Sequence, residues 1–251
     1  MTCSLLVGVF TFSVLGCAGE VTSLPSVARL DMPKLQRDLC DRAGMPGDVP
    51  VHGDMFPCSQ AKWVVWVSPT GSVGQAAIGV YDTTGRLLSW AETDPIIACQ
   101  GLNIRGVGEC VYVLESASGT GLRIRTTTLL SIDSLVPWLS LDTDIWEEGI
   151  EGRNLGRRVE HALVLTDLDK DGDEDIIDIE IARYGVELNQ LLLDPPTTSS
   201  REFVFDHTEN RFVAARGNSS HPASYKLLTS PATTAVGHTR GNGEFFISRA
   251  R

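Results

Sequence analysis

From residue 62 onward, most of the sequence follows the two-residue period of β-strands. Segments such as KWVVWV (residues 62–67) and IIDIEIARY (residues 176–184) are rich in β-branched and aromatic residues. Turn sequences separate these segments, among them the DTTG at the tip of a hairpin expected over residues 77–90. A chain with many short apolar strands must pair them into sheets and bury at least one face of each sheet. The pattern therefore predicts a mainly β fold.

We expect one antiparallel, sheet-rich domain over residues 30–251, built as a propeller-like fragment, a sandwich or a barrel. A short N-terminal helix should precede the sheets within residues 30–46, where Asp31 can cap it and Gly44 can end it. Residues 134–152 hold either one short helix or none. The polar stretch of residues 217–243 predicts a long loop before a last strand.

The charge of the chain narrows the class of partner. Its 251 residues carry a formal net charge of -11. Such acidity argues against nucleic acid or an anionic membrane face as the main partner, because both repel an acidic surface. Hydrophobic residues make up 42% of the chain, which is enough to build a core.

The amino end carries an uncharged apolar run of eleven residues, LLVGVFTFSVL, at positions 5–15. A membrane span needs about 20 residues, so this run is too short to be one. Its length is typical of the apolar part of a signal peptide. An ordinary signal cleaved near Ala18 and a buried strand are both open interpretations of this run.

The residues after this run, VLGC at positions 14–17, resemble the bacterial lipobox, in which a cysteine is lipidated and becomes the first residue of the mature protein. The resemblance implies a signal peptide over residues 1–16, a lipidated Cys17 and a polar tether over residues 17–29. It also implies a location in the bacterial cell envelope, anchored to the outer membrane, with the membrane as a partner through fatty-acid chains such as palmitate.

Four cysteines then remain in the exported chain, at Cys40, Cys58, Cys99 and Cys110. An even number in an exported protein predicts two disulfides. Of the three possible connectivities we favour the local one, which pairs Cys40 with Cys58 and Cys99 with Cys110. Zinc binding is the alternative, although the chain has no C-x-x-C motif and no histidine at ligand spacing.

The stretch DLDKDGDED at residues 167–175 places aspartate at every second position and has a net charge of -5. Two like charges about 4 Å apart repel each other by about 1 kcal/mol in water and by more near a protein surface. A folded loop with this charge needs a cation; otherwise it is an open, solvated acidic turn. Oxygen ligands without histidine or cysteine favour calcium, with magnesium a poorer fit. The expected ligands are the side chains of Asp167, Asp169, Asp171 and Asp175 and the backbone carbonyl of Asp173, with Gly172 at the reversal.

The motif D-x-D-x-D-G-x-x-D between two strands resembles the FG-GAP or VCBS repeat of integrin-type propellers. The resemblance covers residues 160–214 at most and occurs in a single copy. It implies a calcium-binding loop that joins two β-strands. An EF-hand fits less well, because it requires an apolar residue where Glu174 stands, a glutamate where Asp178 stands, and helices on both sides.

No catalytic constellation is evident in the sequence. The five histidines are scattered, and there is neither a G-x-S-x-G elbow nor a phosphate-binding glycine loop. The carboxylates of residues 142–148 could serve glycoside hydrolysis, and the five tryptophans could stack on sugars, but a solvated edge and core positions are simpler interpretations. The sequence thus predicts an envelope lipoprotein whose calcium-stabilised β-rich domain is structural or binds a protein or glycan. The alternative is an exported hydrolase, directed at glycans, with a supporting calcium site.

Overall fold

The structure is a computed structural model that describes residues 30–59, 61–70, 74–119, 122–147, 156–185, 197–215, 233–239 and 245–250. Most of the described residues lie in strands, so the fold is mainly β, as the sequence predicts. The elements are α1 (Met32–Arg42), β1 (Val51–Ser59), β2 (Lys62–Pro69), β3 (Ala76–Asp82), β4 (Leu87–Thr93), β5 (Ile96–Ile104), β6 (Gly108–Gly119), β7 (Leu122–Ser131), β8 (Pro137–Glu147), β9 (Gly156–Thr166), β10 (Asp175–Gly185), β11 (Thr197–Asp206), β12 (Arg211–Ala214), β13 (Thr233–Thr239) and β14 (Phe245–Ala250).

Helix α1 lies where the sequence predicts a helix. The Asp31 Oδ1 accepts a hydrogen bond from the backbone N–H of Lys34 at 3.2 Å, which satisfies one of the free amides of the first turn. After the helix, Gly44 takes a φ of 62°, a left-handed conformation that glycine adopts without steric cost. Leu35 and Leu39 lie four residues apart on one face, and both are buried against the first sheet.

The strands form three sheets in the order of the chain, and paired strands that follow one another in the chain are antiparallel. The first sheet is β1-β2-β3-β4, the second is β5-β6-β7-β8, and the third contains β12-β11-β10-β9. In the third sheet β14 pairs in parallel with β9, and β13 pairs with β14. Short connections join the consecutive strands of the first two sheets, and such connections favour antiparallel neighbours. The first two sheets are four-stranded meanders, the third has six strands, and the described strands do not close into a barrel.

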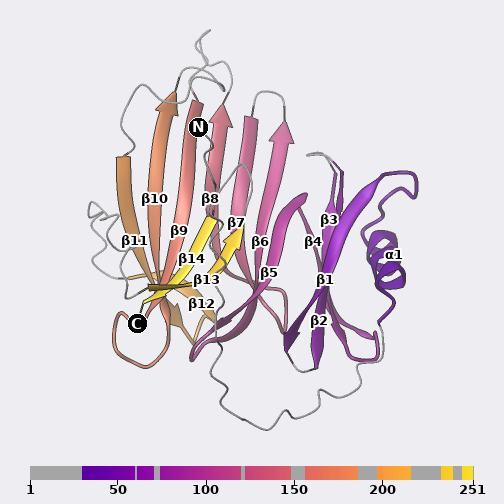
Figure 1. The fold of residues 1–251 in the computed structure, drawn as a ribbon, viewed down its shortest axis with the longest axis horizontal. Helices are drawn as coiled ribbons and strands as arrows, with labels where there is room; N and C mark the ends of the chain where they lie inside the picture. The colour runs from indigo at the N-terminus through magenta and orange to yellow at the C-terminus, as the bar shows by residue number, and fades with distance from the viewer. Residues whose placement is uncertain are drawn as a thin grey trace, which may run out of the picture.

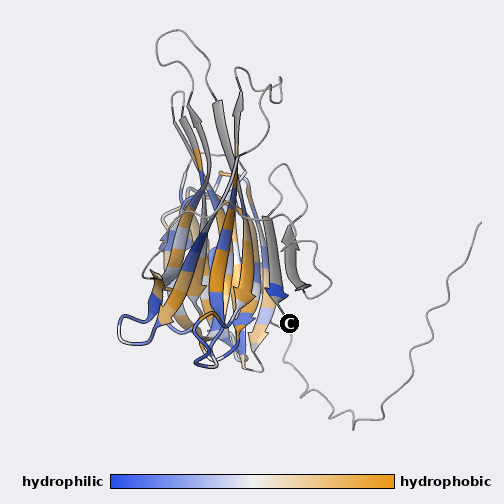
Figure 2. Ribbon diagram, turned by 90° about the vertical axis from the view of Figure 1, so that its left-hand side faces the viewer, coloured by the Kyte–Doolittle hydropathy of each residue, from blue (hydrophilic) through white to orange (hydrophobic). Residues whose placement is uncertain are grey.

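The three sheets follow one another across the molecule, with α1 on the outside of the first sheet (Figure 1). Strand β6 shows why the central sheet is apolar on both faces. Val111 and Val113 pack in the cluster shared with the first sheet, whereas Tyr112 and Leu114 pack in the cluster shared with the third sheet. Figure 2 shows that apolar residues are concentrated along the strands and polar residues at the turns. Burial of these two interfaces holds the stack of sheets together.

Two strands lie where the sequence predicted none, and a third lies where the sequence left open a short helix. Strand β1 lies before residue 60, where we expected the strands to begin; its glycine and proline give it a weak strand signal, and pairing with β2 keeps it extended. Strand β13 lies inside residues 217–243, which we predicted to be a loop, and pairs with β14. Residues 137–147 form strand β8 along the edge of β7 instead of a helix.

The expected signal peptide, tether and lipidated Cys17 lie outside the described residues. No helix within the described residues has the length and apolar character that a bilayer span requires.

Candidate metal centre

The acidic loop of residues 167–175 connects β9 to β10 in the third sheet. Thr166 pairs with Asp175, so the two strands remain paired to the base of the loop. Lys170 and Gly172 take positive φ values of 66° and 102°. These two left-handed residues fold the loop back on itself, and Gly172 does so without a side chain to clash.

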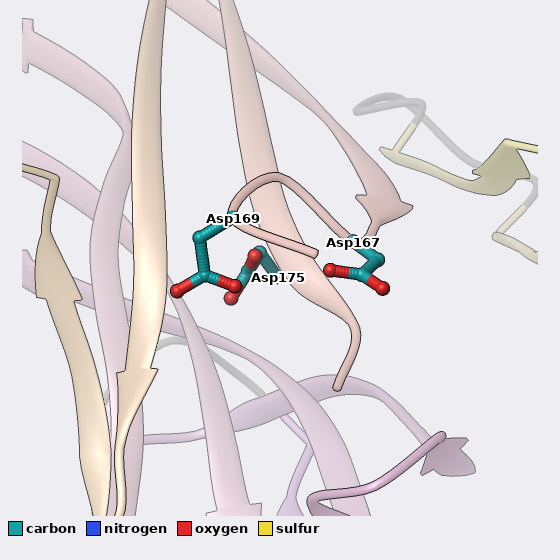
Figure 3. Close-up of side chains that lie close together, drawn as sticks. All are labelled: Asp167, Asp169 and Asp175. Carbon is teal, nitrogen blue, oxygen red and sulfur yellow. The ribbon is translucent and has the colours of Figure 1, made fainter. Parts of the chain in front are cut away.

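Three carboxylates meet on the inner side of this loop. One oxygen from each of Asp167, Asp169 and Asp175 lies within 4.8 Å of the others (Figure 3). Two oxygens on opposite sides of a calcium ion, each about 2.4 Å from it, are separated by about 4.8 Å. The spacing of the three carboxylates is therefore compatible with one shared calcium ion.

Backbone amides of the loop donate hydrogen bonds to the carboxylates of Asp167 and Asp169. Gly172 N donates to Asp167 Oδ2 at 3.2 Å, and Asp171 N donates to Asp169 Oδ1 at 3.2 Å. The other oxygen of Asp167, Oδ1, is buried and has no hydrogen-bond partner. A buried carboxylate oxygen without a partner is unfavourable, so the donor set fits a cation at this position.

Asp175 lies deepest of the three, with 2% of its surface exposed. Its two oxygens accept hydrogen bonds from Leu168 N at 2.8 Å and from Phe205 N at 3.3 Å. Burial raises the pKa of Asp175, and the nearby charges of Asp169 and Asp171 raise it further, although the two hydrogen bonds act in the opposite direction. The ionised form of Asp175 is therefore disfavoured here, and a bound cation would offset that effect.

The two remaining predicted ligands do not join the cluster of three. Asp171 Oδ1 accepts a hydrogen bond from Asp173 N at 2.8 Å. The Asp173 side chain is mostly buried beside Gly106, and its Oδ2 lies 2.5 Å from His207 Nε2. The ligand that the sequence predicts at Asp173 is its backbone carbonyl, so this side-chain contact does not affect that prediction. His207 was not singled out by the sequence, since it lies more than thirty residues further along the chain.

Glu174 has a different role from the other acidic residues of the loop. It is 1% exposed, and its Oε2 accepts hydrogen bonds from Arg105 N at 2.9 Å and from Arg249 Nη2 at 2.8 Å. Arg105 lies in the turn between β5 and β6, and Arg249 lies in β14. Glu174 thus ties the loop to the second sheet and to the last strand. In the sequence it looked like one more carboxylate of the acidic run.

A second buried charged network lies across β9, β10 and β11. Asp178 is fully buried; its Oδ1 lies 2.6 Å from His161 Nδ1, and its Oδ2 accepts a hydrogen bond from Arg201 Nη2 at 2.8 Å. His161 Nε2 also lies 3.0 Å from the backbone carbonyl of Asp142 in β8. Every polar group of Asp178 and His161 has a partner, so the arrangement is a structural network. In the sequence, the sign of this network is Asp178, a charged residue within the largely apolar segment IIDIEI.

No disulfide joins Cys40, Cys58, Cys99 and Cys110 in the structure, and the expected local pairing does not fit this fold. Cys40 packs between α1 and the first sheet, whereas Cys58 packs on the opposite side of that sheet. Cys99 faces the first sheet, whereas Cys110 points to the third sheet. In addition, Cys99 pairs with Val113 and not with Cys110. A sheet backbone therefore separates both expected pairs.

The other candidate residues divide between core and surface. Trp66 and Trp138 are buried in apolar clusters, so the simpler interpretation holds for these two. Asp142 is exposed, and the side chains of residues 143–148 lie outside the described part of the structure. Comparisons of the chain with models of known families, with curated proteins and with solved structures found no match.

Proposed function

We propose that this protein is a lipoprotein of the bacterial cell envelope whose β-rich domain is stabilised by one calcium ion in the acidic loop. The observation that supports calcium most directly is the meeting of Asp167, Asp169 and Asp175 oxygens within 4.8 Å. The buried, unpartnered Asp167 Oδ1 supports it independently. The ion would supply positive charge to a loop of net charge -5.

The role of the ion in this proposal is structural. The loop contacts the second sheet and β14 through Glu174, and it contacts β11 through the Phe205 N–H to Asp175. A cation that orders the loop would therefore stabilise contacts among several strands. The domain would then present a rigid surface to a protein or glycan partner outside the cell membrane.

Calorimetry with calcium tests the proposal. Extracellular calcium modules bind with dissociation constants of about 0.1–1 mM. A tenfold excess over such a constant stabilises a fold by about 1.4 kcal/mol, which raises the melting temperature by a few degrees. EDTA should reverse this rise. Absence of heat at millimolar calcium, together with melting that ignores EDTA, would leave the loop as a solvated acidic turn.

A pair of variants makes the test specific. Asp167→Asn removes the charge next to the unpartnered oxygen while retaining an acceptor for Gly172 N, so it should abolish the calcium response without unfolding the loop. Asp48→Asn is the matched control, since Asp48 is an exposed aspartate after α1, outside the acidic loop. It removes the same charge and should leave the response unchanged.

The proposed location in the cell envelope has its own test. Cys17→Ser should leave the protein unprocessed or soluble in cell fractionation, because the lipid can no longer be attached. A variant that still partitions into detergent like the wild type would refute the lipid anchor.

The hydrolase alternative requires a pocket that gathers two ionisable groups. The groove between β1 and β5 contains one carboxylate, Asp54, beside two thiols, and such a set does not favour glycoside hydrolysis.

A further inference from the structure

His161 is a buried histidine whose ring joins the third sheet to β8 of the second sheet. It lies in β9, beside β8 (Figure 1), and 2% of its surface is exposed. Its Nδ1 lies 2.6 Å from Asp178 Oδ1 in β10, and its Nε2 lies 3.0 Å from the backbone carbonyl oxygen of Asp142 in β8. We propose that His161 carries a proton on both ring nitrogens at neutral pH, and that loss of one proton loosens the contact between β8 and the third sheet. This proposal does not depend on calcium binding in the acidic loop.

Both partners of the His161 ring are hydrogen-bond acceptors. A backbone carbonyl oxygen has no hydrogen to donate, so the contact with Asp142 is a hydrogen bond only when Nε2 carries a proton. The Asp178 carboxylate pairs with Arg201, whose Nε and Nη2 donate to Oδ2 at 3.1 and 2.8 Å. As an anion, Asp178 can only accept, so Nδ1 must donate as well. A neutral ring has a single N–H and would leave a buried acceptor facing a nitrogen lone pair.

The charges nearest the ring also favour the doubly protonated form, the imidazolium. Asp178 is fully buried, and Glu180 stands directly opposite His161 in the register of β9 and β10, on the same face. Both residues are acidic and attract a positive ring. Arg201 in β11 has the opposite effect, but its side chain is 44% exposed, so water screens its charge. Asp142 in β8 is exposed and contacts the ring through its carbonyl.

Two other strands near the ring carry one cation each. Arg249 in β14 bonds Glu174 at the end of β9 next to the acidic loop. Arg125 in β7 is buried on the face toward the third sheet, and the residue opposite it in β8 is Asp144. Because each of these cations has an acidic neighbour in its own surroundings, neither opposes a positive charge on His161 alone.

Loss of one proton would break one of the two bonds of the ring. The carboxylate of Asp178 holds its proton more strongly than a carbonyl does, so the Nε2 proton leaves first. The Nε2 lone pair would then face the Asp142 carbonyl, and the bond from the third sheet to β8 would be lost. A histidine in an unfolded chain loses its proton near about pH 6.5. Above this pH the folded protein binds one more proton than the unfolded chain, so its stability falls as the pH rises.

Nitrogen-15 NMR of the histidine rings at pH 8 tests the protonation state in the wild-type protein. An ordinary histidine is neutral at this pH and has one protonated and one unprotonated ring nitrogen. We expect the ring of His161 to have two protonated nitrogens. Through-bond correlations from the ring to the backbone of residue 161 assign the signal, so this test needs no variant. An unprotonated nitrogen in the ring assigned to His161 would overturn the proposal.

Urea unfolding at pH 7 and pH 8, at one fixed calcium concentration, provides the second readout. Over this unit the folding equilibrium constant of the wild type should fall by about tenfold more than that of His161→Gln, whose neutral side chain does not titrate. His52→Gln is the matched control, since His52 is an exposed histidine of β1 and its loss should leave the wild-type decline unchanged. Free thiols ionise near about pH 8.5, above this window. Equal declines in the wild type and His161→Gln would overturn the proposal.

Discussion

Replacing Glu174 with glutamine should weaken the contacts between the acidic loop, the second sheet and β14. The carboxylate is 1% exposed and accepts hydrogen bonds from Arg105 N and Arg249 Nη2. Glutamine has one acceptor oxygen in place of two, and its amide N–H groups would face the guanidinium. Breaking a buried ion pair costs about 3–5 kcal/mol. The Arg249 side chain is 35% exposed and can recover water, so we expect a smaller loss, about 2 kcal/mol.

Equilibrium unfolding in urea, followed by circular dichroism, measures this loss. A loss of about 2 kcal/mol corresponds to a melting temperature lower by about 4–8 °C for a chain of this size. Glu209→Gln is the matched control, since the Glu209 carboxylate is 49% exposed and pairs with Arg211 at the surface; its effect should stay below about 0.5 kcal/mol. A loss in Glu174→Gln no larger than in this control would refute the anchoring role of Glu174. Calcium affinity should change little, because the Glu174 oxygens face Arg105 and Arg249.

Asp178→Asn should lower the free energy of unfolding by about 2–4 kcal/mol, because it leaves a buried site without its anion, whereas Arg201→Gln should cost less than about 1 kcal/mol since that side chain is 44% exposed. Urea titrations of both variants check this ranking, and equal losses would contradict it. Gly106→Ala should destabilise by about 2–4 kcal/mol, since the residue has a φ of 80° and its new Cβ would lie 1.8 Å from Asp173 Oδ1; an unchanged melting temperature would show that this turn does not pack on the loop. Burial raises the pKa of Glu115, so this group contributes stability below its ordinary pKa of about 4.3 that is lost as pH rises through the raised value. Glu115→Gln should flatten that decline in a pH series of melting curves, and parallel wild-type and variant profiles would argue against it.

Several features of the fold could be predicted from neighbouring residues alone. The two-residue period predicted the mainly β fold, and Asp31 with Gly44 predicted the ends of α1. The acidic loop was predicted with its two flanking strands, β9 and β10, and with the reversal at Gly172. These features depend on contacts within a few residues, so the local sequence carries their signal.

The details of the candidate site depended on residues far apart in the chain. Asp167, Asp169 and Asp175 came together as the spacing suggested, but the hydrogen bond from Asp173 N to Asp171 and the contact of Asp173 with His207 were not evident in the sequence. A strand period gives the alternation of side chains, but it does not say which neighbour each face will meet.

The cysteines show the same limit most clearly. Their even number and short separations predicted the pairs Cys40–Cys58 and Cys99–Cys110, because nearby residues close the smallest loops. The structure puts each of these pairs on opposite faces of a sheet, since side chains alternate along β1, β5 and β6. The sequence by itself determined the strand-rich class of the fold, the helix and the acidic hairpin loop. Only the tertiary structure decided which faces pack together, because stacking the sheets depends on apolar contacts between segments that are distant in the chain.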